Sequence, residues 1–144
     1  MTLSDQERAE KAAAALWSED RASQHLGMRI ETVSPGAATL TMTVQAHHTN
    51  GHGICHGGVI FTLADSAFAF ACNSRNQATV AQHASVSFLA PARLGDQLVA
   101  TAREVTTSGR NGIYDVQVVT TGEGPIAEFR GLSRTVKGTL FDEV

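Results

Sequence analysis

The chain has 144 residues, 42% of them hydrophobic and 17% charged, a composition typical of one globular domain with a single core. It carries 11 Lys and Arg against 14 Asp and Glu. The chain therefore lacks the excess of basic residues that would favour nucleic acid or an anionic membrane as its main partner. Two cysteines make no disulfide framework, and the polar, acidic N-terminus is unlike a secretory signal. We predict a single cytoplasmic domain over residues 1–144.

An N-terminal helical segment is predicted over residues 1–26. Ser4 and Glu7 have the spacing of a capping box, which favours a helix that begins there and continues through the Ala-rich stretch 8–17. Residues 19–25 are predicted to form a second short helix, ended by Gly27. Two strands, 28–33 and 37–44, are then expected around a Ser-Pro-Gly turn, because apolar and small polar residues alternate in the second.

The glycine- and histidine-rich stretch 47–58 breaks this alternation and indicates a loop. A helix is predicted over about residues 57–73, apolar nearly all round, as expected of a helix buried in a core or an interface. Four further strands are predicted, at 79–89, 97–106, 113–121 and 126–136. The last strands are rich in β-branched residues, so we expect an antiparallel meander. The predicted fold class is α+β, with one long central helix wrapped by a five- to six-stranded antiparallel sheet.

Gly57 and Gly58 open the predicted central helix. The first N–H groups of a helix have no intrahelical partner and carry partial positive charge, and glycines let a ligand approach them. This helix end is therefore suited to hold a carbonyl oxygen and to stabilise it as an oxyanion. The alternative, which the local sequence leaves open, is a glycine turn needed only for chain geometry.

Asp65 is the only charged side chain between His56 and Arg75. Buried carboxylates are rare unless they are paired or functional, and one that faces a pocket can act as a general base or a nucleophile. A structural carboxylate bound to a hydroxyl or a helix N-terminus is the alternative. Gly58 and Asp65 lie about 10.5 Å apart along one helix, beyond hydrogen-bond reach. If both are catalytic, we expect the active site to span a homodimer interface.

Two other chemistries are weaker candidates at the same loop. His48, His52 and His56 have a four-residue spacing that suits a metal on a helix face, but the intervening glycines disfavour that helix, and we predict no metal and no cofactor. Cys55 beside His56 resembles a thiol nucleophile pair, yet adjacent side chains usually diverge. Cys72 is expected in the core.

Two further sets of residues are candidate ligand contacts. Arg110, in a predicted hairpin turn with Asn111 and Gly112, is placed to meet a phosphate, although most turn arginines are only solvated. His83 and Ser85, on the strand after the helix, either line a pocket or face solvent or a partner.

Two motifs mark the loop and the predicted central helix: Asn50-Gly51-x-x-x-x-His56-Gly57-Gly58 and Leu63-Ala64-Asp65-x-Ala67-Phe68-Ala69. Together they resemble the hotdog-fold acyl-CoA thioesterases, in particular the PaaI-type phenylacetyl-CoA thioesterases. The agreement covers nearly the whole chain after about Leu16. It extends through Ala71-Cys72-Asn73-Ser74, Phe88-Leu89-x-Pro91, Gly95-Asp96, Gly112-x-Tyr114-Asp115-Val116 and Phe129-Arg130-Gly131.

The resemblance implies a hotdog fold and a role for each of the motif residues. Asp65 would be the catalytic carboxylate and Gly58 the backbone donor to the thioester carbonyl, with Asn50 near the nucleophilic water and His56 near the thioester. Arg110 would contact the CoA phosphates. The resemblance also implies homodimers, often paired into homotetramers, in which the carboxylate and the helix N-terminus come from opposite subunits.

The implied function is hydrolysis of aromatic acyl-CoA thioesters, such as phenylacetyl-CoA or hydroxyphenylacetyl-CoA, in phenylacetate degradation. One alternative is a thioesterase for other medium-chain or aryl acyl-CoAs. The other is a non-catalytic acyl-CoA-binding hotdog protein. The presence of Asp65 together with Asn50 and Gly58 favours an enzyme, because a binding protein needs no base.

Overall fold

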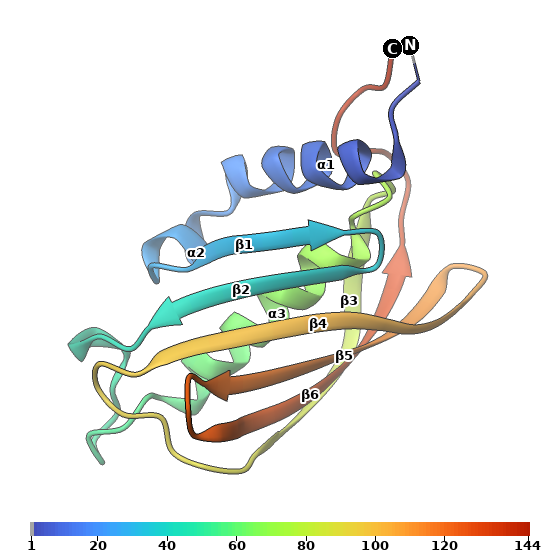
Figure 1. Cartoon of the computed structure of the whole chain (residues 1–144). Helices are drawn as coiled ribbons and strands as arrows, with labels where there is room; N and C mark the ends of the chain where they lie inside the picture. Colours follow the sequence, from blue (N-terminus) through green and yellow to red (C-terminus); the bar gives the residue numbers. More distant parts are fainter. Residues whose placement is uncertain (1) are drawn as a thin grey trace.

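A six-stranded antiparallel sheet curves around one long helix in the computed structural model, which describes residues 2–144 (Figure 1). The helices are α1 (Asp5–Glu19), α2 (Arg21–His25) and α3 (Gly57–Cys72), with a short 3-10 turn at Ala46–His48. The strands are β1 (Arg29–Ser34), β2 (Ala37–Thr43), β3 (Thr79–Phe88), β4 (Gln97–Ser108), β5 (Asn111–Thr120) and β6 (Gly124–Thr135). These elements confirm the predicted α+β class, and the predicted capping box of Ser4 and Glu7 is present.

The predicted meander is confirmed only for β4, β5 and β6. The strand order is β1-β2-β4-β5-β6-β3, so β3 lies at one edge beside β6, and β4 pairs with β2 instead. The segment between β3 and β4 is therefore a crossover and not a hairpin turn. The β4–β5 hairpin closes with only Gly109 and Arg110, because Gly109 adopts a positive φ of +59°. Asn111, predicted in the turn, instead begins β5.

The core lies between α3 and the concave face of the sheet. Leu63, Ala64 and Ala67 of α3 are completely buried there. A Cβ atom on Gly131 would lie 2.7 Å from the Phe68 ring, so the glycine lets β6 approach the helix closely. Figure 1 shows α1 running alongside β1, at that edge of the sheet. Trp17 and Phe70 meet with ring centroids 6.1 Å apart, which joins the N-terminal segment to α3.

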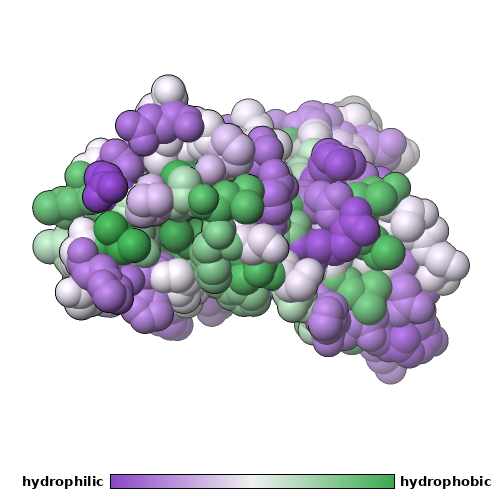
Figure 2. Space-filling view, turned by 90° about the horizontal axis from the view of Figure 1, so that it is seen from below, coloured by the Kyte–Doolittle hydropathy of each residue, from purple (hydrophilic) through white to green (hydrophobic). Residues whose placement is uncertain are grey.

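The β3 edge of the sheet is unusually exposed for a long strand. Nine of the ten residues of β3 are partly or fully exposed, and Val80 and Phe88 are 51% and 52% exposed. Leu89, which follows the strand, is 56% exposed. Figure 2, the view from below, shows apolar surface gathered on this side of the molecule. An unpaired strand edge with apolar side chains is a template for pairing with another chain. No helix within residues 2–144 is long and apolar enough to span a membrane.

Candidate active site

The loop before α3 is held in shape by Asn50. Its side-chain carbonyl accepts hydrogen bonds from the backbone N–H of His52, at 2.9 Å, and of Ile54, at 3.4 Å. Its own backbone N–H donates to the Ile54 carbonyl at 2.9 Å. Because the carbonyl oxygen must face these donors, the side-chain NH₂ is left without a partner among residues 2–144. Asn50 therefore both closes the loop and offers two N–H donors to a ligand.

His56 is the N-cap of α3, and its ring Nδ1 accepts the backbone N–H of Gly58 at 2.8 Å. The N–H groups of Val59 and Ile60 donate to the His56 carbonyl. The N–H of Gly57 is thereby the free donor of the first turn. The Gly58 N–H, the expected donor to the carbonyl, bonds to the His56 ring here, which makes the neighbouring Gly57 N–H a second candidate for that role. A Cβ atom on Gly58 would lie 3.0 Å from Nδ1, so glycine is what lets the ring sit over the helix end.

A cleft of about 470 Å³ opens at this helix end. Its polar contributors are Asn50 and Gly57, and the rest of its lining is largely apolar, from Ile54, Cys55, Ile60, Phe88, Leu89, Ala90 and Pro91. The Phe88 ring lies over Gly57, where an added Cβ atom would come within 3.1 Å of it. The cleft joins the N-terminus of α3 to the exposed end of β3. It can hold an apolar group whose carbonyl faces two polar donors.

Asp65 lies two turns further along α3 and does not line this cleft. Its carboxylate makes no hydrogen bond or ion pair with the side chains and backbone described, although the residue is largely enclosed. Burial raises the pKa of the Asp65 carboxyl above its ordinary value, and the nearby Asp20 carboxylate raises the pKa further. An unpaired carboxylate with a raised pKa is suited to take a proton or to attack an electrophile.

The surroundings of His48 and Cys55 give little support to the two alternative chemistries, a histidine metal site and a thiol nucleophile. His48 is completely buried, and both ring nitrogens bond to backbone, Nδ1 to the N–H of Gln45 and Nε2 to the Leu26 carbonyl. Neither nitrogen is available to a metal. Cys55 is 3% exposed, and burial raises the pKa of its thiol to about 11. Its sulfur lies 3.8 Å from the His56 backbone carbonyl and not against the ring, so the thiol stays protonated at neutral pH.

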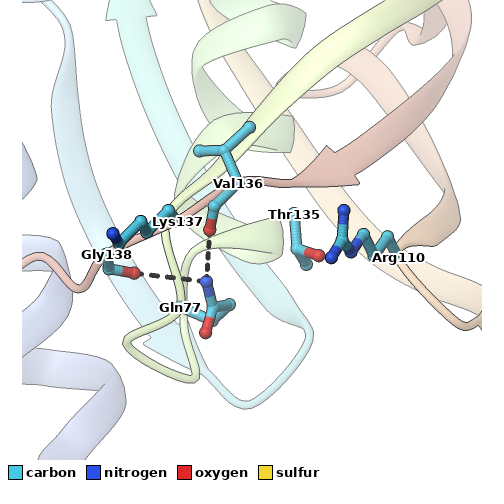
Figure 3. Close-up of a pocket in the computed structure, with 6 residues that line it drawn as sticks. All are labelled: Gln77, Arg110, Thr135, Val136, Lys137 and Gly138. Carbon is cyan, nitrogen blue, oxygen red and sulfur yellow. Dashed lines mark hydrogen bonds between the residues drawn. The ribbon is translucent and has the colours of Figure 1, made fainter.

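A second cleft, of about 520 Å³, lies at the opposite end of α3. Figure 3 shows Arg110 on one side and Lys137 on the other, with Gln77 held by hydrogen bonds to the carbonyls of Val136 and Gly138. Neither cation forms an ion pair with any residue from 2 to 144. An adjoining hollow extends past Asn111 and Gly112. The predicted phosphate contacts thus gather in one place, and Lys137 is an addition that no sequence motif indicated.

His83 and Ser85 lie apart from both clefts. Ala84 and Val86 pack against the core, and because side chains alternate along a strand, Ser85 and His83 point to the face of the sheet away from α3. Both are exposed. Within one chain they do not join Asp65, so of the two interpretations the structure favours side chains that face solvent or a partner.

The comparisons with known proteins agree with this geometry. The model of the thioesterase superfamily matches residues 52–127, which span the helix end, α3 and most of the sheet. The chain belongs to the thioesterase superfamily. The acyl-coenzyme A thioesterase PaaI of Escherichia coli is 42% identical over 131 residues, which are 91% of this chain and 94% of the relative.

Two solved structures extend the likeness to the fold. The E. coli PaaI protein from the phenylacetic acid degradation operon superposes with a TM-score of 0.92 at 41% identity, over 94% of this chain and 99% of that chain. The TT0310 protein of Thermus thermophilus superposes with a TM-score of 0.76 at 37% identity, over 79% of this chain and 96% of that one. The predicted hotdog architecture is therefore confirmed.

Proposed function

We propose that this protein is an acyl-CoA thioesterase that hydrolyses aromatic acyl-CoA thioesters, such as phenylacetyl-CoA or hydroxyphenylacetyl-CoA, in phenylacetate degradation in the cytoplasm. The observation that carries the proposal is that α3 bears both a free Gly57 N–H at an apolar cleft and an unpaired carboxylate, Asp65. The 42% identity to an acyl-coenzyme A thioesterase over most of both chains supports the same reaction.

A homodimer would bring these separated groups together. Gly57 and Asp65 are eight residues, about 12 Å, apart on one helix, and α3 is about 24 Å long in all. The Phe88 end of β3 lies at the N-terminus of α3, and the Thr79 end follows its C-terminus. Antiparallel pairing of two β3 edges would therefore set the N-terminus of one α3 beside the middle and C-terminal end of the other. Pairing of such dimers into a homotetramer is the expected higher assembly.

In this arrangement one chain supplies Asn50, His56 and Gly57, and the other supplies Asp65. The Gly57 N–H, with the side-chain donors beside it, polarises the thioester carbonyl and holds the oxyanion. Ionised Asp65 removes a proton from water as the water oxygen bonds to the carbonyl carbon, or it attacks that carbon itself and forms an anhydride that water then cleaves. The C–S bond breaks as the oxyanion collapses, and the CoA thiolate takes up a proton.

Release of thiol from a panel of acyl-CoAs tests the function. We expect turnover to be highest with phenylacetyl-CoA and its ring-hydroxylated forms, because the apolar cleft favours a compact ring over a long or charged acyl chain. Highest turnover with medium-chain substrates would contradict the proposed preference for phenylacetyl groups and would favour the alternative, a thioesterase for other medium-chain or aryl acyl-CoAs. Tight binding with no thiol release from any substrate would leave a non-catalytic acyl-CoA-binding protein.

The cleft of Arg110 and Lys137 would receive the phosphates of CoA. Replacing both residues by Gln should raise KM for phenylacetyl-CoA roughly tenfold or more and change kcat little, because contacts to a remote phosphate bind ground state and transition state alike. An acyl-pantetheine substrate, which lacks the nucleotide, should not distinguish the variant from the wild type. Arg29→Gln, an exposed cation elsewhere, is the matched control. An unchanged KM for the CoA ester would move the phosphate site away from this cleft.

A further inference from the structure

The N-terminal segment contacts α3 beside Asp65 through a chain of three polar side chains. Ser23 is 1% exposed and Ser66 is 7% exposed, and their hydroxyl oxygens lie 2.7 Å apart. The Ser23 hydroxyl also donates to the Asp20 carboxylate at 2.7 Å, and the Ser23 N–H donates to it at 3.0 Å. Two successive hydrogen bonds therefore link Asp20 to α3: Asp20 bonds to Ser23, and Ser23 bonds to Ser66, the residue that follows Asp65.

We infer that Asp20 is a positioning residue for the reaction at Asp65: anchored by Ser23 to Ser66, it keeps a second negative charge beside the reacting carboxylate. The inference rests on the proposed catalytic role of Asp65. The two carboxylates have opposite surroundings, since Asp20 accepts two hydrogen bonds and Asp65 accepts none from residues 2–144. A carboxylate held this close to Asp65 raises the pKa of the Asp65 carboxyl and so makes Asp65 the stronger base.

Few other charges face Asp65. The strands packed against α3 present buried apolar side chains to it, such as Leu40, Leu98 and Val116. Cys72, on α3 itself, is buried and has its thiol pKa raised to about 12, so it stays neutral. The partner's His56 would join the site in the proposed dimer and is the same in every variant below. The family match begins at residue 52, so α2 and Asp20 lie outside the part of the chain that it covers.

The test is the pH dependence of kcat/KM for phenylacetyl-CoA. Asp20→Asn should move the midpoint of the acidic limb to lower pH by roughly half a unit or more, because removal of a neighbouring negative charge makes Asp65 easier to ionise. Asp20→Ser, which also preserves an N-cap side chain, should give the same shift. Asp20→Glu should restore most of the wild-type midpoint. Glu19→Gln, the loss of an exposed charge one residue away, should leave the midpoint unchanged.

A purely structural role for Asp20 would lower the unfolding temperature without moving the midpoint. Midpoints that stay at the wild-type value in folded Asp20→Asn and Asp20→Ser would overturn the inference and leave the proposed function standing. If the wild type hydrolyses no acyl-CoA, the proposed function fails, and titration of the Asp65 carboxyl by ¹³C NMR in wild type and Asp20→Asn decides the inference directly. A lower carboxyl pKa in the variant supports it, and an equal one refutes it.

Discussion

Asp65→Asn should lose hydrolysis of phenylacetyl-CoA by at least about 10²-fold in kcat, because the amide can neither accept the proton of water nor attack the thioester. The two side chains have nearly the same shape, so KM should change little. Purified variant and wild type would be compared by thiol release over a range of substrate concentrations. Asp142→Asn, an exposed carboxylate in the C-terminal segment, is the control and should retain full activity.

The same variant should be as stable as the wild type or more stable. The pKa of Asp65 is raised on folding, so its ionised form at neutral pH is less well accommodated in the folded chain than in the unfolded one. Removing the charge relieves this cost near pH 7, and the difference between the proteins should shrink as the pH falls and wild-type Asp65 becomes protonated. A structural carboxylate predicts the reverse, a lower unfolding temperature with activity retained. Thermal unfolding at pH 7 and pH 4.5 distinguishes the two.

The helices and strands could be predicted from the sequence because their signals are local. The capping box of Ser4 and Glu7, the apolar face pattern of residues 57–72 and the alternation in the strands all lie within a few residues of the elements they specify. The place of β3 could not be predicted, since its pairing with β6 depends on which apolar faces cover α3. Neighbours in sequence are usually neighbours in a sheet, and here that tendency fails.

The candidate site divides in the same way. Asn50, Asp65 and the glycines form motifs, so the sequence could indicate them. That Gly57 and not Gly58 keeps a free N–H depends on the rotamer of the His56 ring, which no motif records. The place of Lys137 opposite Arg110, and that of Asp20 near Asp65, follow from contacts between segments far apart in the chain. Such contacts are fixed by packing, and single residues carry no sign of them.

Two inactive variants should restore activity to each other if the site is shared between chains. Asp65→Asn is the first, and Asn50→Asp is the second, because an aspartate can still accept the loop hydrogen bonds that the Asn50 carbonyl makes but offers no N–H donor. In a heterodimer of the two, both lesions fall in one site and the other site is intact. Random mixing makes about half of the dimers hetero, so about a quarter of wild-type activity should return.

The experiment unfolds and refolds the two variants together, and native mass spectrometry with a mass tag on one chain counts the heterodimers. Each variant refolded alone is the control and should stay inactive. Activity that rises in proportion to the heterodimer fraction requires Asp65 and Asn50 to act from opposite chains, as the separation of Gly57 and Asp65 along α3 demands. If heterodimers form and the mixture stays inactive, both groups act within one chain. The carbonyl would then have to bind near the middle of α3 and not at the Gly57 N–H, since about 12 Å of rigid helix cannot be spanned by one water molecule.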